Sequence, residues 1–385
     1  MKKTYLLLTL FLLNTSVACS QKENYPPIED FNKDSFSLEK IIDDIEIPWG
    51  LSFTGIDSFL VTDKKGILYH VSEGKKSIVE GTPDITLSRQ GGLLDVAVDL
   101  NFDNNNKIFL TASITSSDTG SNTALYSAIL SNNKLSDLRL LYKALPDSTE
   151  ERHFGGSILV TQEFVFFTIG DRGNRDVNPQ SVSLDGGKVY RLNLDGSIPD
   201  SNPFYNVDSS KKAIWSYGHR NPQGIIKVTR NVGVNDYEIW IHEHGPRGGD
   251  EINKILFGKN YGWPITSYGE KYGLGYTKKS YYKKNHAKYG FEEPVYSFVP
   301  SIGISEIIKL PNSFSEHFQN NFILSSLYGR HIYRIKFDNT FKKIIYLEDI
   351  FVGERIRDLK YDDKLNLIYL AFEENGEIGI ISNNL

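Results

Sequence analysis

Polar and cationic side chains recur at one place along this chain, directly in front of short apolar segments. Histidine can accept a proton near neutral pH, and arginine is a permanent cation whose planar fork of donors suits carboxylates. A purely structural turn would need only Gly, Asn or Asp there. The residues concerned are Gln90, His153, the run 219–224, Ser301, Arg355 and Arg357. Each alone has an ordinary structural explanation, but their recurrence in five segments indicates one shared site.

A second patch, residues 243–253, is rich in acids, Gly and Pro. Asp250 and Glu251, with backbone carbonyls freed by the Gly/Pro turn, offer the oxygen ligands that calcium prefers. A solvated acidic turn is the alternative, and the spacing leaves both open. We reject a zinc site at His242 and His244, because no third nitrogen or sulfur ligand is evident.

The elements that must position these residues recur about every 50 residues. Each copy has a Gly-led apolar strand, a second hydrophobic strand, a turn and a third strand that often contains Tyr. The six predicted copies are 50–53, 59–62 and 66–71; 92–98, 107–111 and 124–130; 156–160, 164–169 and 187–192; 224–228, 238–241 and 251–255; 304–310, 322–325 and 331–335; and 356–361, 367–372 and 378–381.

This repetition predicts an all-β fold, a six-bladed β-propeller with four-stranded blades around a central channel. A radial repeat of strands protects its edges by closing on itself, and no helical stripe of useful length interrupts the pattern. We place the propeller at residues 35–385. Loops that enter the innermost strands converge on one face of such a fold, so the polar residues in front of them should meet there.

Composition and charge favour strands and argue against a nucleic-acid partner. The chain has 385 residues, 12 % of them aromatic, and a formal net charge of −5. The aromatic content favours half-buried strands. No basic run occurs outside the extreme N-terminus, so no nucleic-acid partner is expected.

The N-terminus has the pattern of an export signal. Lys2 and Lys3 precede an apolar stretch, Leu6 to Leu13, that is too short to span a membrane. Cys19, the single cysteine of the chain, follows it directly. We expect a signal peptide at 1–18, a lipid-anchored flexible tether at 19–34, and a periplasmic or cell-surface lipoprotein that touches the membrane only through its anchor. An ordinary cleaved signal peptide is the alternative.

Seven short blocks in this order resemble the glucose/sorbosone dehydrogenase family, especially its soluble aldose sugar dehydrogenase branch. They are Ile47-Pro-Trp-Gly-Leu51, Gln90-Gly-Gly-Leu-Leu-Asp95, His153-Phe-Gly-Gly156, Tyr217-Gly-His-Arg-Asn-Pro-Gln-Gly224, Glu243-His-Gly-Pro246, Gly249-Asp-Glu-Ile-Asn253 and Asn260-Tyr-Gly-Trp-Pro264. The resemblance implies a quinoprotein that oxidises aldose sugars at C1 to the lactone, with pyrroloquinoline quinone (PQQ) and Ca²⁺ as cofactors.

The resemblance also implies roles for single residues. By position, His153 matches the general base, and Arg220 and Asn221 match residues that face the quinone oxygens. Gln90 and Tyr272 match further cofactor contacts, and Arg355 and Arg357 match the arginines that hold the cofactor's carboxylates. The carbonyls of Gly245 and Pro246 match ligands of the cofactor's calcium, while Glu251 and the carbonyl of Tyr261 match a second, structural calcium.

One position departs from the family pattern. Where the family commonly has a lysine that contacts the quinone, this chain has Tyr328, in the run Ser326-Leu-Tyr-Gly329. The exchange removes a positive charge, while a tyrosine can still donate one hydrogen bond. It puts cofactor affinity or turnover in question.

Two other functions stay open on the sequence. One is a calcium-dependent hydrolase of the lactonase type, and the other is a non-catalytic propeller that binds a sugar or a protein. If the chain is a dehydrogenase, its electrons must pass to a separate acceptor, because no haem-attachment motif is present. The preferred aldose and the question of a homodimer are also open.

Overall fold

The predicted repeats form six antiparallel sheets of four strands each in the computed structural model. The structure describes residues 36–116, 119–229, 237–272, 282–315, 318 and 321–383. The expected signal peptide (1–18) and tether (19–34) lie outside the described residues. The prediction of a six-bladed propeller with four-stranded blades is confirmed.

The strand bounds follow the chain from blade to blade. The first five sheets are β2 (Pro48–Gly55), β3 (Ser58–Asp63), β4 (Ile67–Ser72) and β5 (Lys75–Val79); β6 (Leu93–Val98), β7 (Lys107–Ile114), β8 (Asn122–Ser131) and β9 (Lys134–Lys143); β10 (Ile158–Val160), β11 (Phe164–Ile169), β12 (Lys188–Asn193) and β13 (Ile214–Tyr217); β14 (Pro222–Thr229), β15 (Tyr237–Glu243), β16 (Asp250–Ile255) and β17 (Tyr296–Phe298); and β18 (Ile304–Lys309), β19 (Asn321–Ser326), β20 (His331–Phe337) and β21 (Ile344–Phe351). The sixth sheet combines β22 (Ile356–Asp362), β23 (Leu367–Phe372) and β24 (Glu377–Asn383) with β1 (Phe36–Ile42).

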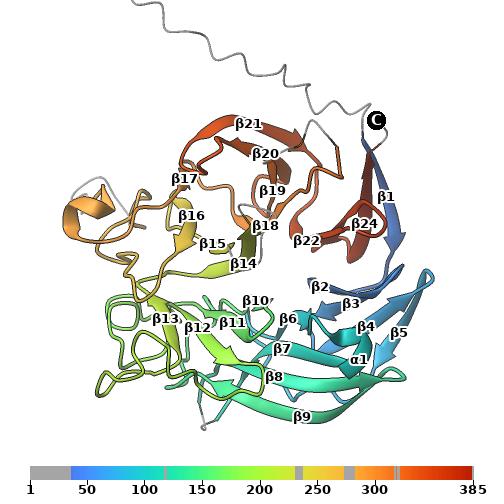
Figure 1. Cartoon of the computed structure of the whole chain (residues 1–385), viewed down its shortest axis with the longest axis horizontal. Helices are drawn as coiled ribbons and strands as arrows, with labels where there is room; N and C mark the ends of the chain where they lie inside the picture. The colour runs from blue at the N-terminus through green and yellow to red at the C-terminus, as the bar shows by residue number, and fades with distance from the viewer. Residues whose placement is uncertain are drawn as a thin grey trace, which may run out of the picture. The chain divides into compact units, whose positions relative to one another are not determined.

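The six sheets surround an axis, with β2, β6, β10, β14, β18 and β22 innermost (Figure 1). Each innermost strand contacts the next one around the ring, and β22 contacts β2. The ring is closed by pairing of the chain ends, because β1 lies antiparallel to β24 from Phe36↔Asn383 to Ile42↔Ile378. The innermost strand of each sheet is an edge strand that faces the axis, and the polar loops meet at one end of that axis.

The core lies between neighbouring sheets and is rich in aromatic rings. Trp240 of β15 stacks on Phe322 of β19 in the next sheet, with ring centroids 5.4 Å apart. Phe167 of β11 stacks on Tyr190 of β12 at 5.0 Å. This packing explains why the aromatic residues are concentrated in the strands.

The fourth strand of each blade was not located in the sequence. These outer strands bury little, as the strict alternation of half-buried and exposed residues along β21 shows, so they lack the apolar run that marks the inner strands. Helices are short: α1 (Phe102–Asn105) and the 3₁₀ turn η2 (His286–Tyr289). No helix in the described ranges is long and apolar enough to cross a membrane.

Candidate active site on the propeller axis

A cavity of about 220 Å³ opens where the innermost strands begin, and all six blades contribute to its wall. Five predicted site residues line it, and no Asp or Glu does. Its lining residues are Trp49, Gln90, Phe154, Gly155, Asn221, Gln223, His244, Gly303, Leu327, Tyr328, Arg355 and Arg357. The loops therefore converge as the repeat pattern predicted.

His153 stands in the loop before β10, next to two residues of the cavity wall. Its Nδ1 lies 2.7 Å from Oδ1 of Asp171, and its backbone N–H donates to Oε1 of Gln90 at 2.8 Å. Asp171 also accepts from Nε1 of Trp263 at 2.8 Å and from the backbone N–H of Gly173 at 2.8 Å. These bonds fix the carboxylate, and the carboxylate in turn fixes the imidazole.

The pKa values of this pair favour a neutral imidazole beside an ionised carboxylate. Burial and the charge of Arg220 lower the pKa of His153 below 6.5, although Asp171 opposes them. Burial alone would raise the pKa of Asp171, but the hydrogen bond and charge of His153 lower it overall. An ionised Asp171 needs a proton on Nδ1 of His153, which leaves Nε2 with a free lone pair. The pair can act as a base at neutral pH.

The loop that carries His153 is held by a buried arginine. The guanidinium of Arg172 lies 3.4 Å above the ring of Phe154 and donates to the carbonyls of Glu150, at 2.6 Å, and Arg152. Gly155 follows with φ = +64°, and a Cβ there would lie 2.9 Å from the backbone N of Gly170. Only glycine fits this close approach without strain.

Arg220 and Asn221 continue the wall from the loop before β14. Asn221 Oδ1 accepts from the N–H of Gly155 at 3.1 Å, which ties two blades together. The guanidinium of Arg220 donates to the carbonyl of His244 at 2.9 Å and lies 5.4 Å from the ring of Trp263. It lines a smaller neighbouring cavity rather than the one that Asn221 lines. The positive charge of Arg220 therefore lies close to both cavities.

Arg355 and Arg357 both enter the axial cavity, and both pair with Glu373 behind them. Arg357 Nε donates to Glu373 Oε2 at 3.0 Å, and Nη2 of Arg355 lies 3.5 Å from both carboxylate oxygens. The guanidinium of Arg357 lies 4.0 Å over the ring of Trp49. Both guanidiniums pair with Glu373 rather than with Asp358, their neighbour in the sequence.

The residues expected to bind calcium meet around the smaller cavity. It measures about 10 Å³, close to the room that one water molecule needs. Gly245, Pro246, Glu251 and Tyr261 all line it, together with Arg220, His244, Thr266 and His286. His244 belongs to the walls of both cavities.

The chemistry of this small cavity fits a cation. Burial, and then the nearby charge of Glu243, raise the pKa of Glu251 well above its usual value, and a cation would relieve both effects. Thr266 Oγ1 is buried and has no hydrogen-bond partner among the described residues. Within the described ranges no three His, Cys, Asp or Glu side chains form a metal cluster, so backbone carbonyls would have to supply most ligands.

The carboxylate of Asp250 contacts residues of both cavities. This role differs from the calcium ligation that the sequence suggested. Its carboxylate accepts from the N–H groups of Gly245, Gly303 and Ile304, at 2.9, 2.8 and 3.2 Å, and from the hydroxyl of Ser301 at 2.7 Å. A carboxylate with this many donors is a structural anchor. It holds the loops before β16 and β18 in register.

Tyr272 is not brought into the axial cavity. It is 70 % exposed and does not line the cavity wall, and residues 273–281 beside it lie outside the described part. Tyr328 does line the cavity, at its mouth, with 82 % of its surface exposed. The structure thus leaves the expected cofactor contact of Tyr272 without a geometric basis.

Several site residues escaped the sequence reasoning. Asp171 and Glu373 lie just after the second strands of their blades, β11 and β23, whereas the polar residues singled out in the sequence lie in the loops before the first strands. In an antiparallel blade the end of the second strand lies beside the start of the first, as the pair Ile356↔Phe372 shows. That register is the signal that could have found them.

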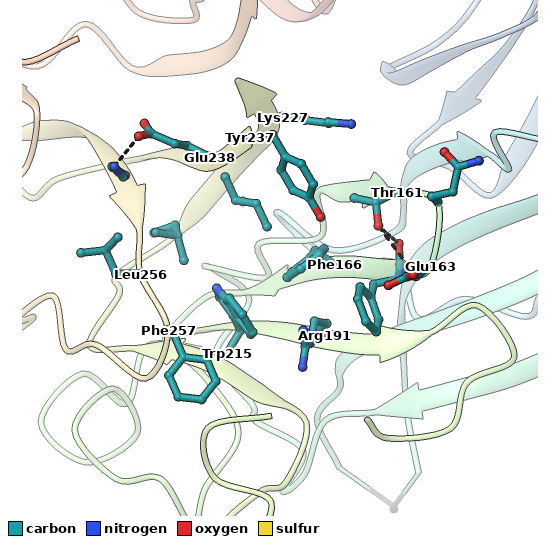
Figure 2. Close-up of a pocket in the computed structure, with 15 residues that line it drawn as sticks. Thr161, Glu163, Phe166, Arg191, Trp215, Lys227, Tyr237, Glu238, Leu256 and Phe257 are labelled. Atoms are coloured by element: carbon teal, nitrogen blue, oxygen red, sulfur yellow. Dashed lines mark hydrogen bonds and ion pairs between the residues drawn. The ribbon is translucent and has the colours of Figure 1, made fainter. Parts of the chain in front are cut away.

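A larger cavity, of about 830 Å³, lies between the third and fourth sheets (Figure 2). Trp215 faces Phe257 there with ring centroids 5.3 Å apart, and Lys254 pairs with Glu238. Its walls hold no histidine, and Thr161 and Phe164 place it at the far end of the innermost strand from His153. We assign the candidate site to the axial cavity, where five of the predicted site residues converge.

Known proteins resemble this chain in architecture and in sequence. The model of the family described as glucose/sorbosone dehydrogenase matches residues 45–380. Aldose sugar dehydrogenase YliI of Escherichia coli (strain K12) is 32 % identical over 352 residues, which are 89 % of this chain and 91 % of that protein. The crystal structure of the soluble aldose sugar dehydrogenase from Escherichia coli in the apo-form superposes with a TM-score of 0.82 at 30 % identity, covering 91 % of this chain and 100 % of that one.

A further relative is quinoprotein glucose dehydrogenase B of Acinetobacter calcoaceticus, 28 % identical over 278 residues, or 64 % of this chain and 56 % of that protein. The fold, the axial site and these relatives define an oxidoreductase of the sugar dehydrogenase class. The chain belongs to the glucose/sorbosone dehydrogenase family.

Proposed function

We propose that this chain oxidises aldose sugars at C1 to the lactone, with PQQ as oxidant and Ca²⁺ as its metal. One observation carries the proposal: the His153–Asp171 pair adjoins a cavity that has two arginines and no carboxylate in its wall. That wall suits a tricarboxylate, since a guanidinium group can donate two parallel hydrogen bonds to one carboxylate. Trp49, held flat under Arg357, offers a planar surface beside them.

The residues fit both cofactors. Arg355, Arg357, Gln90 and Asn221 would hold PQQ from the cavity wall, with Tyr328 at the mouth. The carbonyls of Gly245 and Pro246 would ligate the cofactor's calcium, and Glu251 with the carbonyl of Tyr261 would ligate a second one. When bound, PQQ supplies an orthoquinone that accepts a hydride.

The protein's own part in the reaction is acid–base and electrostatic. Nε2 of His153 takes the proton of the anomeric hydroxyl as the C1–H bond breaks, and Asp171 stabilises the imidazolium that results. Arg220 brings a fixed positive charge to the side where negative charge develops. The proton then leaves His153 for solvent, which readies the base for the next sugar.

The test is a titration of purified, metal-stripped protein with PQQ and Ca²⁺, followed by glucose and other aldoses, with the quinone spectrum as readout. Reduction of bound quinone establishes the dehydrogenase and ranks its sugars. Binding without reduction by any aldose contradicts the substrate class, and no binding favours the non-catalytic propeller. Restoration by Zn²⁺ but not by Ca²⁺ contradicts the metal.

Two variants separate the proposed roles. His153→Ala should abolish turnover and leave PQQ binding intact, whereas Arg357→Ala should weaken binding first. Equal loss of both properties in both variants would contradict the separation. A lactonase-type hydrolase would need several Asp, Asn and Glu side chains on one central metal, and among the described residues no three His, Cys, Asp or Glu side chains are arranged to hold a metal ion.

We further propose, on the N-terminal sequence, that the protein is exported and anchored through Cys19, and that a separate protein or small molecule accepts its electrons. Cys19→Ser should release the protein from membranes in a fractionation experiment. Continued membrane association of that variant would overturn the anchor. Sedimentation of the released protein would also test whether it forms a homodimer.

A further inference from the structure

The two arginines of the axial cavity are already neutralised in part by an internal anion. Arg355 directly precedes β22, and Arg357 lies within a register irregularity between Ile356 and Asp358 at the start of that strand. Their guanidiniums converge on Glu373, which follows β23 directly. The backbone N–H of Glu373 donates to the carbonyl of Arg355 at 2.9 Å, which fixes this register.

Glu373 stands behind the arginines and not in the cavity wall. The wall contains both arginines but no carboxylate. The pKa of Glu373 is lowered, because the charges and hydrogen bonds of Arg357 and Arg355 outweigh its burial, so the group is an anion at neutral pH. The trio therefore carries one net positive charge where two guanidiniums alone would carry two.

We propose that Glu373 is a built-in counterion that competes with the carboxylates of an anionic cofactor for Arg355 and Arg357, and so limits the affinity of the cavity. This inference rests on the proposed PQQ function and adds a residue to it. Glu373 offsets the repulsion between the two guanidinium charges, which both donate to its carboxylate. An arriving carboxylate must draw the same donors away from it.

The geometry explains how the exchange can occur. Arg357 makes the closer contact, with two of its nitrogens on Oε2 of Glu373, and its Nη1 lies 3.4 Å from Oε1 of Gln223 in the cavity wall. Arg355 holds Glu373 only at 3.5 Å, and about a third of its side chain is exposed. Arg355 is thus the easier of the two for an incoming carboxylate to recruit.

A third cation adjoins this group. Lys64 donates to the backbone carbonyl of Arg89 at 2.8 Å, beside the cavity residue Gln90. It lies close enough to Glu373 and Arg357 for both charges to act on its ammonium. Removal of the negative charge of Glu373 would therefore make the electrostatic potential around Lys64, Arg355 and Arg357 more positive.

The experiment is the affinity of purified, calcium-loaded Glu373→Gln for PQQ, measured by quenching of tryptophan fluorescence, with Trp49 in the wall as a reporter. Gln keeps the shape and one acceptor for Arg357 but removes the charge. We expect PQQ to bind about tenfold tighter than to the wild type at low ionic strength, and the gain to shrink as salt screens the cavity.

Glu374→Gln is the matched control. Glu374 is the next residue, is about 40 % exposed and pairs with Arg330 at 2.9 Å, so the same loss of charge occurs at the surface. Its PQQ affinity should stay within about twofold of the wild type. An equal gain in both variants would show a general charge effect and overturn the specific role of Glu373.

Failure of this inference is distinct from failure of the proposed function. If the wild type does not bind PQQ at all, the proposed function fails. If the wild type binds and Glu373→Gln binds equally or more weakly while folded, Glu373 assists the cofactor and the inference fails. Should Glu373→Gln not fold, Glu373→Asp, which withdraws the carboxylate by one methylene, must still bind PQQ more tightly than the wild type.

Discussion

At the scale of single residues, the base strength of His153 depends on its carboxylate partner. Asp171→Asn removes the charge that holds the proton on Nδ1 and allows the amide to donate to that nitrogen instead. We expect kcat to fall by about 100-fold or more, within the usual range for a lost acid–base group. Stopped-flow reduction of the bound quinone by an aldose measures this step directly.

The pH profile distinguishes this role from simple support of the fold. His153 must be neutral to accept a proton, and burial with Arg220 holds its pKa below 6.5, so the rate should fall as pH drops through that pKa. Asp171 raises the pKa of His153, and Asp171→Asn should therefore move the inflection to lower pH. The exposed neighbour Asp176, changed to Asn, should leave rate and profile alone. If the inflection of the pH–rate profile does not move in Asp171→Asn, the proposed role of the His153–Asp171 pair is contradicted.

Tyr328 gives a second prediction at this scale. It lines the mouth of the cavity and is largely exposed, so Tyr328→Lys adds a cation near the cofactor with little strain. We expect PQQ affinity to rise by about three- to tenfold at low salt, and the gain to fade with added salt. Tyr328→Gln, which changes shape without charge, is the control in the same fluorescence titration. Equal affinities of the Lys and Gln variants would mean that charge at this position is irrelevant.

At the scale of elements, Asp250 couples the loops of two blades. Asp250→Asn replaces one acceptor oxygen with an NH₂ group that faces the N–H donors of Gly303 and Ile304. Buried donors left without an acceptor cost about 1–3 kcal/mol each, so we expect the free energy of unfolding to drop by about 2 kcal/mol or more. Urea denaturation measures it.

The same substitution should also weaken calcium binding, because Asp250 holds the N–H of Gly245 at 2.9 Å and thereby aims its carbonyl. Asp195→Asn is the comparison: Asp195 accepts from Ser197 in an exposed turn, and its loss should change stability by less than about 1 kcal/mol. Similar losses in the two variants would show that Asp250 has no special place between the blades.

The elements also show what the sequence could predict. Inner strands such as β11 and β23 consist almost entirely of apolar residues, so their positions followed from the hydrophobic pattern, and the loops around them followed in turn. Outer strands such as β9 and β21 are half exposed and gave no such signal. Asp171, Asp250 and Glu373 were missed as partners because their contacts join segments whose proximity depends on strand register, which composition and spacing do not reveal.

At the scale of the whole molecule, ring closure gathers charge on the axis. A small cavity adjoins the axial cavity, with which it shares Trp49, Gln223 and Arg357. It is lined from all six innermost strands or the loops before them, and three of its residues are Asp95, Glu306 and Asp358. Lys360 Nζ lies 2.9 Å from Glu306 and 3.3 Å from Asp358. Three buried carboxylates thus share one ammonium group, and no single blade produces this arrangement.

This excess of acid predicts a stability that depends on pH. Burial raises the pKa of Asp95 to about 6 from 3.8, against the influence of Lys360 and with that of Glu306 added. A raised carboxyl pKa means that the folded state binds a proton more tightly than the unfolded state. This contribution is full below pH 3.8 and is lost as pH rises through 6, with a total of about 3 kcal/mol at 1.36 kcal/mol per unit.

Asp95→Asn tests this prediction, because Asn keeps one oxygen for the N–H of Val96 or Ile158 and cannot ionise. Urea unfolding at pH 5 and pH 7 should show the wild type losing more stability over that interval than the variant, since the variant lacks the carboxylate that must be ionised in the channel. Asp338→Asn, a change in a surface turn where the side chain is half-buried, serves as control and should keep the wild-type slope. If the free energy of unfolding changes with pH equally in the wild type and in Asp95→Asn, Asp95 is ionised in the folded protein at pH 5. In that case Lys360 offsets the effect of its burial.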